Sequence, residues 1–236
     1  METVDMAHWK QISGGLTRIS AGSRTNVWGV NANGAIYRYT NDDANPWVNI
    51  PGGLVEISAA ADGTVWGVNA NNNIYRYTGD QGTSHWKQIS GGLTRISAGS
   101  RTNVWGVNAN GAIYRYTNDD ANPWIKIPGG LTDISAAADG TVWGVNANNN
   151  IYRYTGDQGT SHWKQISGAL TRISTGSRTN VWGVNSSAAI YRYTNDDANP
   201  WVNIPGGLTD ISAAADGTVW GVNANNNIYR YTGDQP

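Results

Sequence analysis

The chain has 236 residues and a formal charge of −1, and only 14% of its residues are charged. This composition provides no basic field that would hold nucleic acid or anionic lipid. The sequence contains no cysteine, which excludes disulfides and thiolate chemistry. It also lacks a run of about 18 apolar residues, and residues 1–6 include two acids, so we expect neither membrane insertion nor a signal peptide, and a cytoplasmic location.

The first 40 residues contain four short segments typical of strands. Residues 9–12 and 16–21 alternate in polarity, residues 26–31 are rich in Val and Trp, and residues 35–40 follow as the fourth segment. Asn33-Gly34 lies between the last two and is a strong signal for a tight hairpin. No stretch has the apolar period of a helix, so the sequence predicts an all-β chain.

The pattern Val-Trp-Gly-Val-Asn occurs six times along the chain. Its tryptophans are Trp28, Trp66, Trp105, Trp143, Trp182 and Trp220, spaced by 38 or 39 residues. A repeat of this length with four short strands is typical of a β-propeller, in which each blade buries the faces of its neighbours. We therefore predict that residues 1–236 form one all-β domain, a six-bladed β-propeller with four antiparallel strands in each blade.

The two ends of the chain predict how the ring closes. The segment Trp9–Ile12 precedes the first complete repeat, and the last repeat ends before a matching strand. We expect the N-terminal strand to complete the last blade.

The repeats alternate between two kinds. Odd repeats carry Ser-Arg-Thr-Asn in their first turn, as at 23–26, and even repeats carry Asp-Gly-Thr, as at 62–64. Two explanations of the near-identity of the repeats remain open. One is recent duplication or consensus design, and the other is selection for several equal binding sites. The fifth repeat departs from the pattern, with Ser186-Ser187-Ala188 in place of Ala-Asn-Gly, which predicts a looser hairpin and a weaker site there.

The motifs, taken together, resemble one known family. Trp followed by Ile, Gly, Leu and Ile-Ser, then Val-Trp-Gly-Val-Asn and Ile-Tyr-Arg, recurs over essentially the whole chain. This order is similar to that of tectonin-type β-propeller lectins, the fungal and slime-mould members above all. The resemblance implies multivalent binding of O-methylated glycans, of the mannose or fucose type, on bacterial or nematode surfaces in defence. Animal relatives bind bacterial glycolipids or serve as adaptor domains.

A candidate sugar site follows from treating Asn33-Gly34 as a two-residue turn. Trp28 then faces Tyr39 and Gly29 faces Arg38, which leaves a hollow beside the arginine, with Asn31 on the same face. Guanidinium and amide donors beside aromatic rings suit sugar recognition. The candidate sugar-binding residues are the Trp, Asn, Tyr and Arg of each repeat: Trp28, Asn31, Tyr37, Arg38; Trp66, Asn69, Tyr75, Arg76; Trp105, Asn108, Tyr114, Arg115; Trp143, Asn146, Tyr152, Arg153; Trp182, Asn185, Tyr191, Arg192; and Trp220, Asn223, Tyr229, Arg230.

Structural roles compete with these assignments. Arg38 could stack on aromatic rings, and Trp28 could belong to the core between blades. An enzyme is not expected, because His8, His85 and His162 occupy equivalent loops and no nucleophile–base pair is visible. We expect no cofactor, and no metal either, since the spacing of the loop acids fits no calcium-binding loop.

Two functions remain open at this level. One is a lectin with up to six equivalent sites that act by avidity, and a homo-oligomer would multiply its valency. The alternative is a protein-interaction scaffold that binds no sugar. The near-identity of the repeats favours the lectin, because a scaffold face needs asymmetry to define one orientation of its partner.

Overall fold

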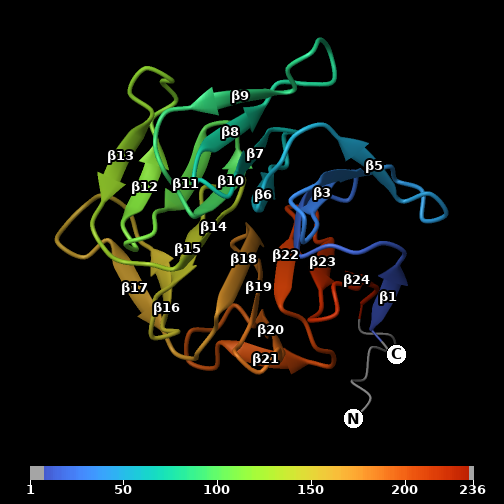
Figure 1. The fold of residues 1–236 in the computed structure, drawn as a ribbon. Coiled ribbons are helices and arrows are strands. Elements are labelled where there is room, and N and C mark those ends of the chain that lie inside the picture. The colour runs from blue at the N-terminus through green and yellow to red at the C-terminus, as the bar shows by residue number, and fades with distance from the viewer. Residues whose placement is uncertain (1–7, 234–236) are drawn as a thin grey trace.

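A computed structural model describes residues 8–233 of the chain. The described residues form six four-stranded antiparallel sheets, arranged as blades around a central axis (Figure 1). This confirms the predicted six-bladed β-propeller. No helix of the length and apolarity that crossing a membrane requires occurs between residues 8 and 233.

In blades one to five the strands run outward from the axis in chain order, and in blade six the N-terminal strand is the outermost. Blade one contains β2 (Arg18–Ser23), β3 (Asn26–Val30), β4 (Ile36–Tyr39) and β5 (Trp47–Ile50), and blade two contains β6 (Glu56–Ala59), β7 (Val65–Val68), β8 (Ile74–Tyr77) and β9 (Trp86–Ile89). Blade three contains β10 (Arg95–Ser100), β11 (Asn103–Val107), β12 (Ile113–Tyr116) and β13 (Trp124–Ile127), and blade four contains β14 (Asp133–Ala136), β15 (Val142–Val145), β16 (Ile151–Tyr154) and β17 (Trp163–Ile166). Blade five contains β18 (Arg172–Ser177), β19 (Asn180–Val184), β20 (Ile190–Tyr193) and β21 (Trp201–Ile204), and blade six contains β22 (Asp210–Ala213), β23 (Val219–Val222), β24 (Ile228–Tyr231) and β1 (Trp9–Ile12).

The predicted closure of the ring is also confirmed. Strand β1 pairs antiparallel with β24, with Trp9 opposite Tyr231 and Ile12 opposite Ile228. The first and last strands therefore lie side by side in one blade (Figure 1). This pairing covers the edge that β24 would otherwise leave open.

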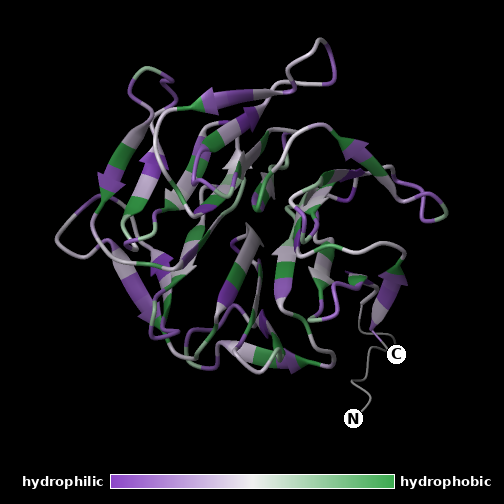
Figure 2. Ribbon diagram, viewed as in Figure 1, coloured by the Kyte–Doolittle hydropathy of each residue, from purple (hydrophilic) through white to green (hydrophobic). Residues whose placement is uncertain are grey.

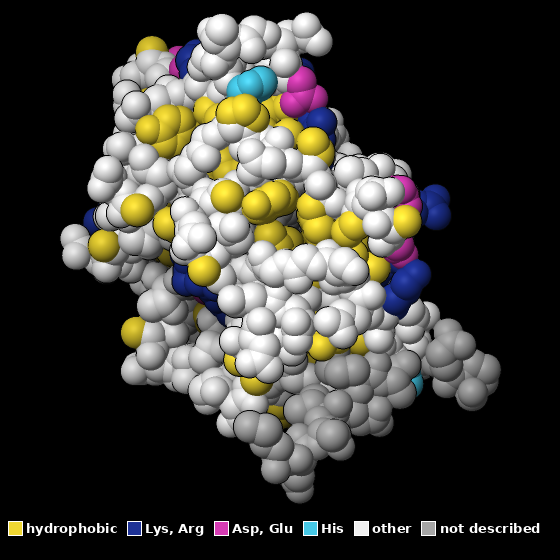
Figure 3. Space-filling model, turned by 45° about the vertical axis from the view of Figure 1, so that its right-hand side comes forward, with side chains coloured by type: hydrophobic (Ala, Val, Ile, Leu, Met, Phe, Trp, Pro, Cys, Tyr) yellow, Lys and Arg dark blue, Asp and Glu magenta, His cyan; other side chains and the backbone are white. Residues whose placement is uncertain are grey.

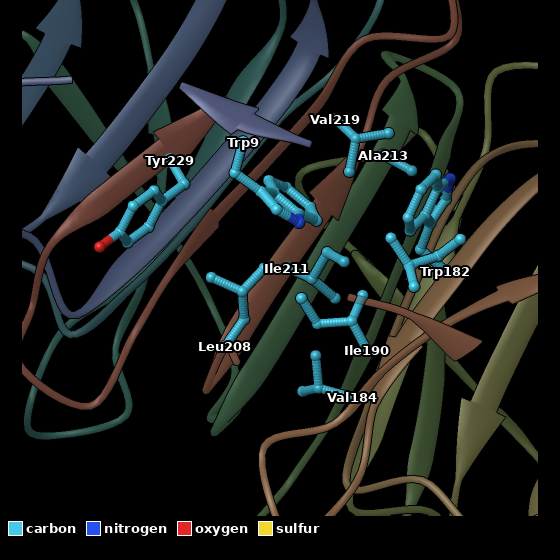
Figure 4. Packing of buried hydrophobic residues seen from close by; sticks show 10 residues of the cluster. Trp9, Trp182, Val184, Ile190, Leu208, Ile211, Ala213, Val219 and Tyr229 are labelled. Carbon is cyan, nitrogen blue, oxygen red and sulfur yellow. The ribbon is translucent and has the colours of Figure 1, made fainter. Parts of the chain in front are cut away.

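The core lies between the blades. Between blades five and six, the buried side chains of Trp182 and Ile190 pack with Ile211, Leu208 and Trp9 (Figure 4). Equivalent clusters fill the other five interfaces. Green and purple segments succeed one another along the strands in Figure 2, as expected for short strands that bury some side chains and expose others.

The predicted register of the third and fourth strands was wrong by one residue. Trp28 lies opposite Arg38 and Gly29 lies opposite Tyr37. The turn is longer than two residues: Gly34 N donates to Asn31 O, and Asn31 N donates to Ala35 O. Gly34 has a φ of 79°, as in three-residue hairpins that end in a left-handed residue. A shift of one residue exchanges the faces of a strand, so Arg38 shares a face with Trp28.

The expected hollow beside Gly29 is therefore not present. A Cβ atom built on Gly29 would lie 2.3 Å from Cδ1 of Leu16 and 2.9 Å from the carbonyl oxygen of Arg18. The space next to this glycine is filled by Leu16, whose side chain is buried.

Blade five keeps the same turn despite its altered sequence. Ala188 N donates to Asn185 O, and Asn185 N donates to Ala189 O. Ala188 takes the left-handed position with a φ of 64°. Since a Cβ atom in this conformation costs roughly 1–2 kcal/mol, the turn of blade five is strained, although its hydrogen bonds are those of the other blades.

Polar side chains connect the six innermost strands around the axis. In each blade a buried serine hydroxyl accepts a hydrogen bond from a backbone N–H of the following blade, as Ser20 Oγ does from Ala59 N at 2.9 Å. The six serines are Ser20, Ser58, Ser97, Ser135, Ser174 and Ser212. These bonds satisfy backbone donors that have no sheet partner at the inner edges of the blades.

Candidate functional site: three clefts between alternate blades

The six predicted tryptophans lie in the core between blades. Each has at most 2% of its surface exposed. The guanidinium of the opposite arginine lies over the indole, at 5.4 Å from the ring centroid for Arg38 and Trp28 and at 5.3 Å for Arg76 and Trp66. These tryptophans form the floor of the blade interfaces rather than an open surface.

The six predicted asparagines hold the turn after the second strand of each blade. Asn31 Oδ1 accepts hydrogen bonds from Asn33 N at 3.0 Å and from Ala35 N at 2.9 Å. The equivalent Asn69, Asn108, Asn146, Asn185 and Asn223 accept the same pair of bonds. In the structure, the side-chain oxygens of these residues fix the backbone.

The predicted tyrosines face away from the tryptophans and arginines of their own blades. Tyr37 packs partly buried against the cluster that blade one shares with blade six. The equivalents Tyr75, Tyr114, Tyr152, Tyr191 and Tyr229 take the same place in the other clusters. The four predicted residue types of one repeat therefore do not converge on one side of a blade.

The predicted arginines reach across to the next blade. Arg76 Nη1 and Nη2 donate to the two oxygens of Asp120 in blade three, at 2.9 and 2.8 Å, and Nη1 also donates to Tyr116 Oη at 3.1 Å. Lys87 Nζ donates to the same carboxylate at 2.6 Å. The same network occurs with Arg153 and Asp197, and with Arg230 and Asp43.

Open clefts lie at these same three interfaces, each between an even blade and the following odd blade. Their volumes are about 560 Å³ between blades two and three, 620 Å³ between blades four and five, and 540 Å³ between blades six and one. We call them cleft 2/3, cleft 4/5 and cleft 6/1. Volumes of this size suit a small molecule or a sugar residue.

Cleft 2/3 is built from the edges of two blades. Blade two contributes its Asp-Gly-Thr turn together with Arg76 and Tyr77, and blade three contributes the turn at 101–102 with Tyr116 and Asn118. The same residues recur in cleft 4/5 (Asp139, Gly140, Thr141, Arg153, Tyr154, Arg178, Thr179, Tyr193 and Asn195) and in cleft 6/1 (Asp216, Gly217, Thr218, Arg230, Tyr231, Arg24, Thr25, Tyr39 and Asn41).

Hydrogen bonds across the interface keep the walls of the cleft in place. Asp62 Oδ2 accepts from Arg101 N of the next blade at 2.7 Å, and Oδ1 accepts from Thr64 N at 3.0 Å. Burial would raise the pKa of Asp62, but these backbone donors hold it below its usual value. The hydrogen bonds from Arg76 hold the pKa of Asp120 well below its usual range, against the opposing effect of burial. Both carboxylates are therefore ionised and engaged near neutral pH.

The alternating first turns distinguish the interfaces that carry these clefts. In odd blades Asn26 Oδ1 accepts from Trp28 Nε1 at 2.8 Å, and Asn26 Nδ2 donates to Ala60 O of the next blade at 2.8 Å. The equivalent residue in even blades is Thr64, which lines the cleft. The indole N–H of Trp66 is buried without a hydrogen-bond partner, and so are those of Trp143 and Trp220.

Of the residues predicted for the site, only Arg76, Arg153 and Arg230 line the three clefts. The turn residues Asp62, Thr64, Arg101 and Thr102 and their equivalents were missed. The sequence carried a signal for them, since the two kinds of first turn alternate with the period of two blades. The sequence did not show which turns of neighbouring blades lie next to each other.

Charged side chains of both signs lie on the face of the molecule shown in Figure 3. In the face shown in Figure 3, acidic and basic side chains lie next to one another among uncharged groups. Among the residues that the structure describes, no group of three or more His, Asp or Glu side chains is placed to hold a metal ion. The walls of the clefts, with their amide, hydroxyl, guanidinium and aromatic groups, therefore suit a neutral polar ligand with apolar patches.

Comparison with solved structures shows the fold. The chain is similar to YCF48 bound to D1 peptide (TM-score 0.60, 16% identity, 96% of this chain and 94% of that chain covered). It is also similar to YCF48 from Cyanidioschyzon merolae (TM-score 0.56, 15% identity, 95% and 85% covered) and to U3-55K (TM-score 0.66, 9% identity, 97% and 99% covered).

The search of curated proteins finds no match. The profile of the Tectonin domain, in contrast, matches residues 2–124 and 119–236, which together span nearly the whole sequence. The chain belongs to the Tectonin domain family.

Proposed function

We propose that this protein is a multivalent glycan-binding lectin whose sites are the three clefts between even and odd blades. The observation that carries the proposal is the repetition of one cleft, with the same mixed polar and aromatic walls, at three interfaces. Sugars present hydroxyl groups beside apolar C–H faces, which such walls can bind together. The resemblance to tectonin lectins adds the finer proposal, an O-methylated glycan of the mannose or fucose type on a bacterial or nematode surface.

Three sites on one chain favour binding to a surface over binding to a single free sugar. Once one cleft is occupied, binding at the next is intramolecular, so that weak single sites give a tight complex. Because the clefts are related by the repeat of two blades, each should contribute a similar affinity. A soluble monosaccharide would then bind weakly and a densely glycosylated surface strongly.

The experiment that tests the proposal is binding to a glycan array that includes O-methylated mannose and fucose beside their unmethylated parents. The matched variants are Arg24→Ala/Arg101→Ala/Arg178→Ala, which change an exposed wall residue of every cleft, and Gln11→Ala/Gln88→Ala/Gln165→Ala, which change exposed residues on the outer strands. We expect the arginine variant to lose array binding at least about tenfold and the glutamine variant to keep it. Equal binding by both variants would count against the clefts.

The alternative is a protein-interaction scaffold. One similar propeller has been solved bound to a peptide, although its 16% identity makes it a guide to the fold alone. Binding to no glycan by the correctly folded protein would favour the scaffold.

A further inference from the structure

A narrow passage follows the axis of the propeller, enclosed by the six innermost strands. Two small chambers lie along it, with volumes of about 60 and 50 Å³. The serines that connect the blades line both chambers, so their ring lies between the two: Ser20, Ser58, Ser97, Ser135, Ser174 and Ser212. The first chamber is also lined by charged side chains, including Glu56 and Arg172. The second, which we call the axial chamber, is lined by these serines, by alanines and glycines, and by Thr175.

The serines of the axial chamber have hydroxyl protons to donate. Each serine oxygen accepts the backbone N–H of the following blade at 2.8 or 2.9 Å, and each serine has at most 9% of its surface exposed. A hydroxyl that accepts a hydrogen bond still carries one proton. None of the six donates that proton to another residue within 8–233. Because the N–H group polarises the hydroxyl that accepts it, each serine becomes a better donor.

Thr175 adds a seventh hydroxyl to this lining. Its side-chain oxygen is buried without a hydrogen-bond partner, and the residue has only 3% of its surface exposed. Blades one and three carry Ala21 and Ala98 at the same position, so packing does not require a hydroxyl there. Buried hydroxyls are normally hydrogen-bonded, because leaving them without a partner costs free energy. The seven hydroxyls therefore indicate an acceptor that comes from outside the chain.

The size of the axial chamber limits this acceptor to a very small species. A water molecule occupies about 30 Å³ of liquid, so a volume of about 50 Å³ admits one or two particles of this size and excludes sugars and phosphate. Water accepts hydrogen bonds but also brings two protons, and no carboxylate lines this chamber to receive them. A monatomic anion accepts from several donors and brings no proton, which matches a lining of hydroxyl donors.

The charged residues on the other side of the serines balance one another. Three arginines alternate with three acids at the start of the innermost strands: Arg18, Glu56, Arg95, Asp133, Arg172 and Asp210. Arg172 Nη1 donates to Asp133 Oδ1 at 3.0 Å, and Arg95 Nη1 donates to Glu56 Oε2. Three positive and three negative charges give this ring a formal charge of zero. An anion in the axial chamber therefore does not face a negatively charged ring.

We infer that the axial chamber binds one halide ion, such as chloride, which accepts hydrogen bonds from the Thr175 hydroxyl and from serine hydroxyls of several blades. The ion links innermost strands that belong to different sheets, so its binding should stabilise the closed ring. The axial chamber shares no lining residue with the three clefts, and the inference does not depend on the proposed glycan binding.

The first experiment compares melting temperatures of the full chain in sodium chloride and in sodium gluconate at equal ionic strength. Chloride bound by the folded state alone should raise the melting temperature as its concentration increases, whereas gluconate is too large for the chamber. In crystals soaked in bromide, we expect anomalous scattering from one bromide ion on the axis, between Thr175 and the serines.

Variants of Thr175 test the ligand set. Thr175→Val removes the hydroxyl but keeps the shape of the side chain, and it should weaken chloride binding about tenfold, as expected for the loss of one hydrogen bond to a charged group. Thr175→Ser keeps a hydroxyl and should bind chloride as the wild type does. The control Thr83→Val makes the same change at an exposed loop position outside the chamber and should leave the chloride dependence unchanged. If Thr175→Val does not fold, Thr175→Ala takes its place, since blades one and three carry alanine there.

Four results would overturn the inference. The first two are a wild-type melting temperature that is the same in chloride and gluconate, and bromide found only at the surface of the protein. The third is electron density on the axis without anomalous scattering, which would identify water in the chamber. The fourth is an equal dependence on chloride in Thr175→Val and in the wild type, which would place the halide elsewhere.

Discussion

Two neighbouring interfaces of the ring are built from equivalent strands but from different turns. They are the interface between blades one and two and the interface between blades two and three. At the first, Asn26 joins the Trp28 indole to the next blade, and Arg38 pairs through Nη2 with Asp80, whose side chain is 49% exposed. At the second, Arg76 forms two hydrogen bonds with Asp120, and Lys87 joins the same carboxylate.

The difference shows two ways in which neighbouring blades of one repeat protein are held together. One kind of interface is closed near the axis by an asparagine and a tight backbone contact. The other is held by its ion-pair network and keeps a cleft above an unpaired tryptophan. The differences between the two kinds include five successive residues at the first turn (22–26 against 60–64), the hairpin turn (33–35 against 71–73) and the loop before the outer strand (41–46 against 79–85).

The largest effect is expected at the closest backbone contact of the odd-to-even interface. A Cβ atom on Gly22 would lie 2.1 Å from Ala60 O and 2.2 Å from its carbonyl carbon. Because these are backbone atoms, Gly22→Ala forces the inner strands apart and should destabilise the protein by about 3 kcal/mol or more. Thermal unfolding measures the change, with Gly53→Ala as a contrast, since a Cβ atom there meets nothing within 4 Å and Gly53 is outside the left-handed region. An unchanged melting temperature for Gly22→Ala would mean that the blades approach less closely than described.

The next effect comes from the asparagine itself. Asn26→Ala removes the acceptor of the Trp28 indole, whose N–H is then unpaired, and one donor to Ala60 O, which keeps its bond from Gly63 N at 3.2 Å. We expect a loss of about 1–3 kcal/mol in the free energy of unfolding. Thr64→Ala at the even interface, where no such bond exists, should cost clearly less. Equal losses for the two variants in denaturant titrations would remove the distinction between the interfaces.

A smaller change in the opposite direction is expected in blade five. Ala188 has a φ of 64°, where glycine is favoured. Ala188→Gly should therefore stabilise the protein by about 1 kcal/mol. The control Ala189→Gly alters the next residue, which is outside the left-handed region. A decrease in the denaturant midpoint for Ala188→Gly would show that the backbone at residue 188 is not strained by its alanine.

The smallest effect per site concerns pH at the even-to-odd interfaces. Hydrogen bonds from arginine lower the pKa of Asp43, Asp120 and Asp197 in the folded state. A lowered pKa contributes stability that is present above the unfolded value of about 3.9 and is lost as the pH falls through the folded value. For partly exposed pairs we expect about 1 kcal/mol or less at each interface.

Melting temperatures recorded from about pH 5 down to about pH 2 test this dependence. The variant Asp43→Asn/Asp120→Asn/Asp197→Asn should show a flatter decrease than the wild type. Asp119→Asn changes a neighbouring acid that accepts only local bonds, from Ala121 N and Asn122 Nδ2, and should keep the steep decrease. Parallel curves for the triple variant and the wild type would show that protonation of these carboxylates does not contribute to the loss of stability in acid.

The sequence by itself determined the parts of this protein that depend on local pattern. The period of the Val-Trp-Gly-Val-Asn motif specified the number of blades, alternating polarity specified the strands, and the lone segment Trp9–Ile12 specified the closure. These features could be predicted because strand propensity, turn chemistry and repeat length act over a few residues or repeat unchanged along the chain.

Only the tertiary structure decided the register of the second hairpin and the position of the clefts. The choice between a two-residue and a three-residue turn after Asn31 depends on the left-handed residue and on packing against Leu16. The site joins Thr64 and Arg76 of one blade to Arg101 and Tyr116 of the next. No local pattern relates residues so far apart in the chain, because their proximity is set by the packing of one blade on another.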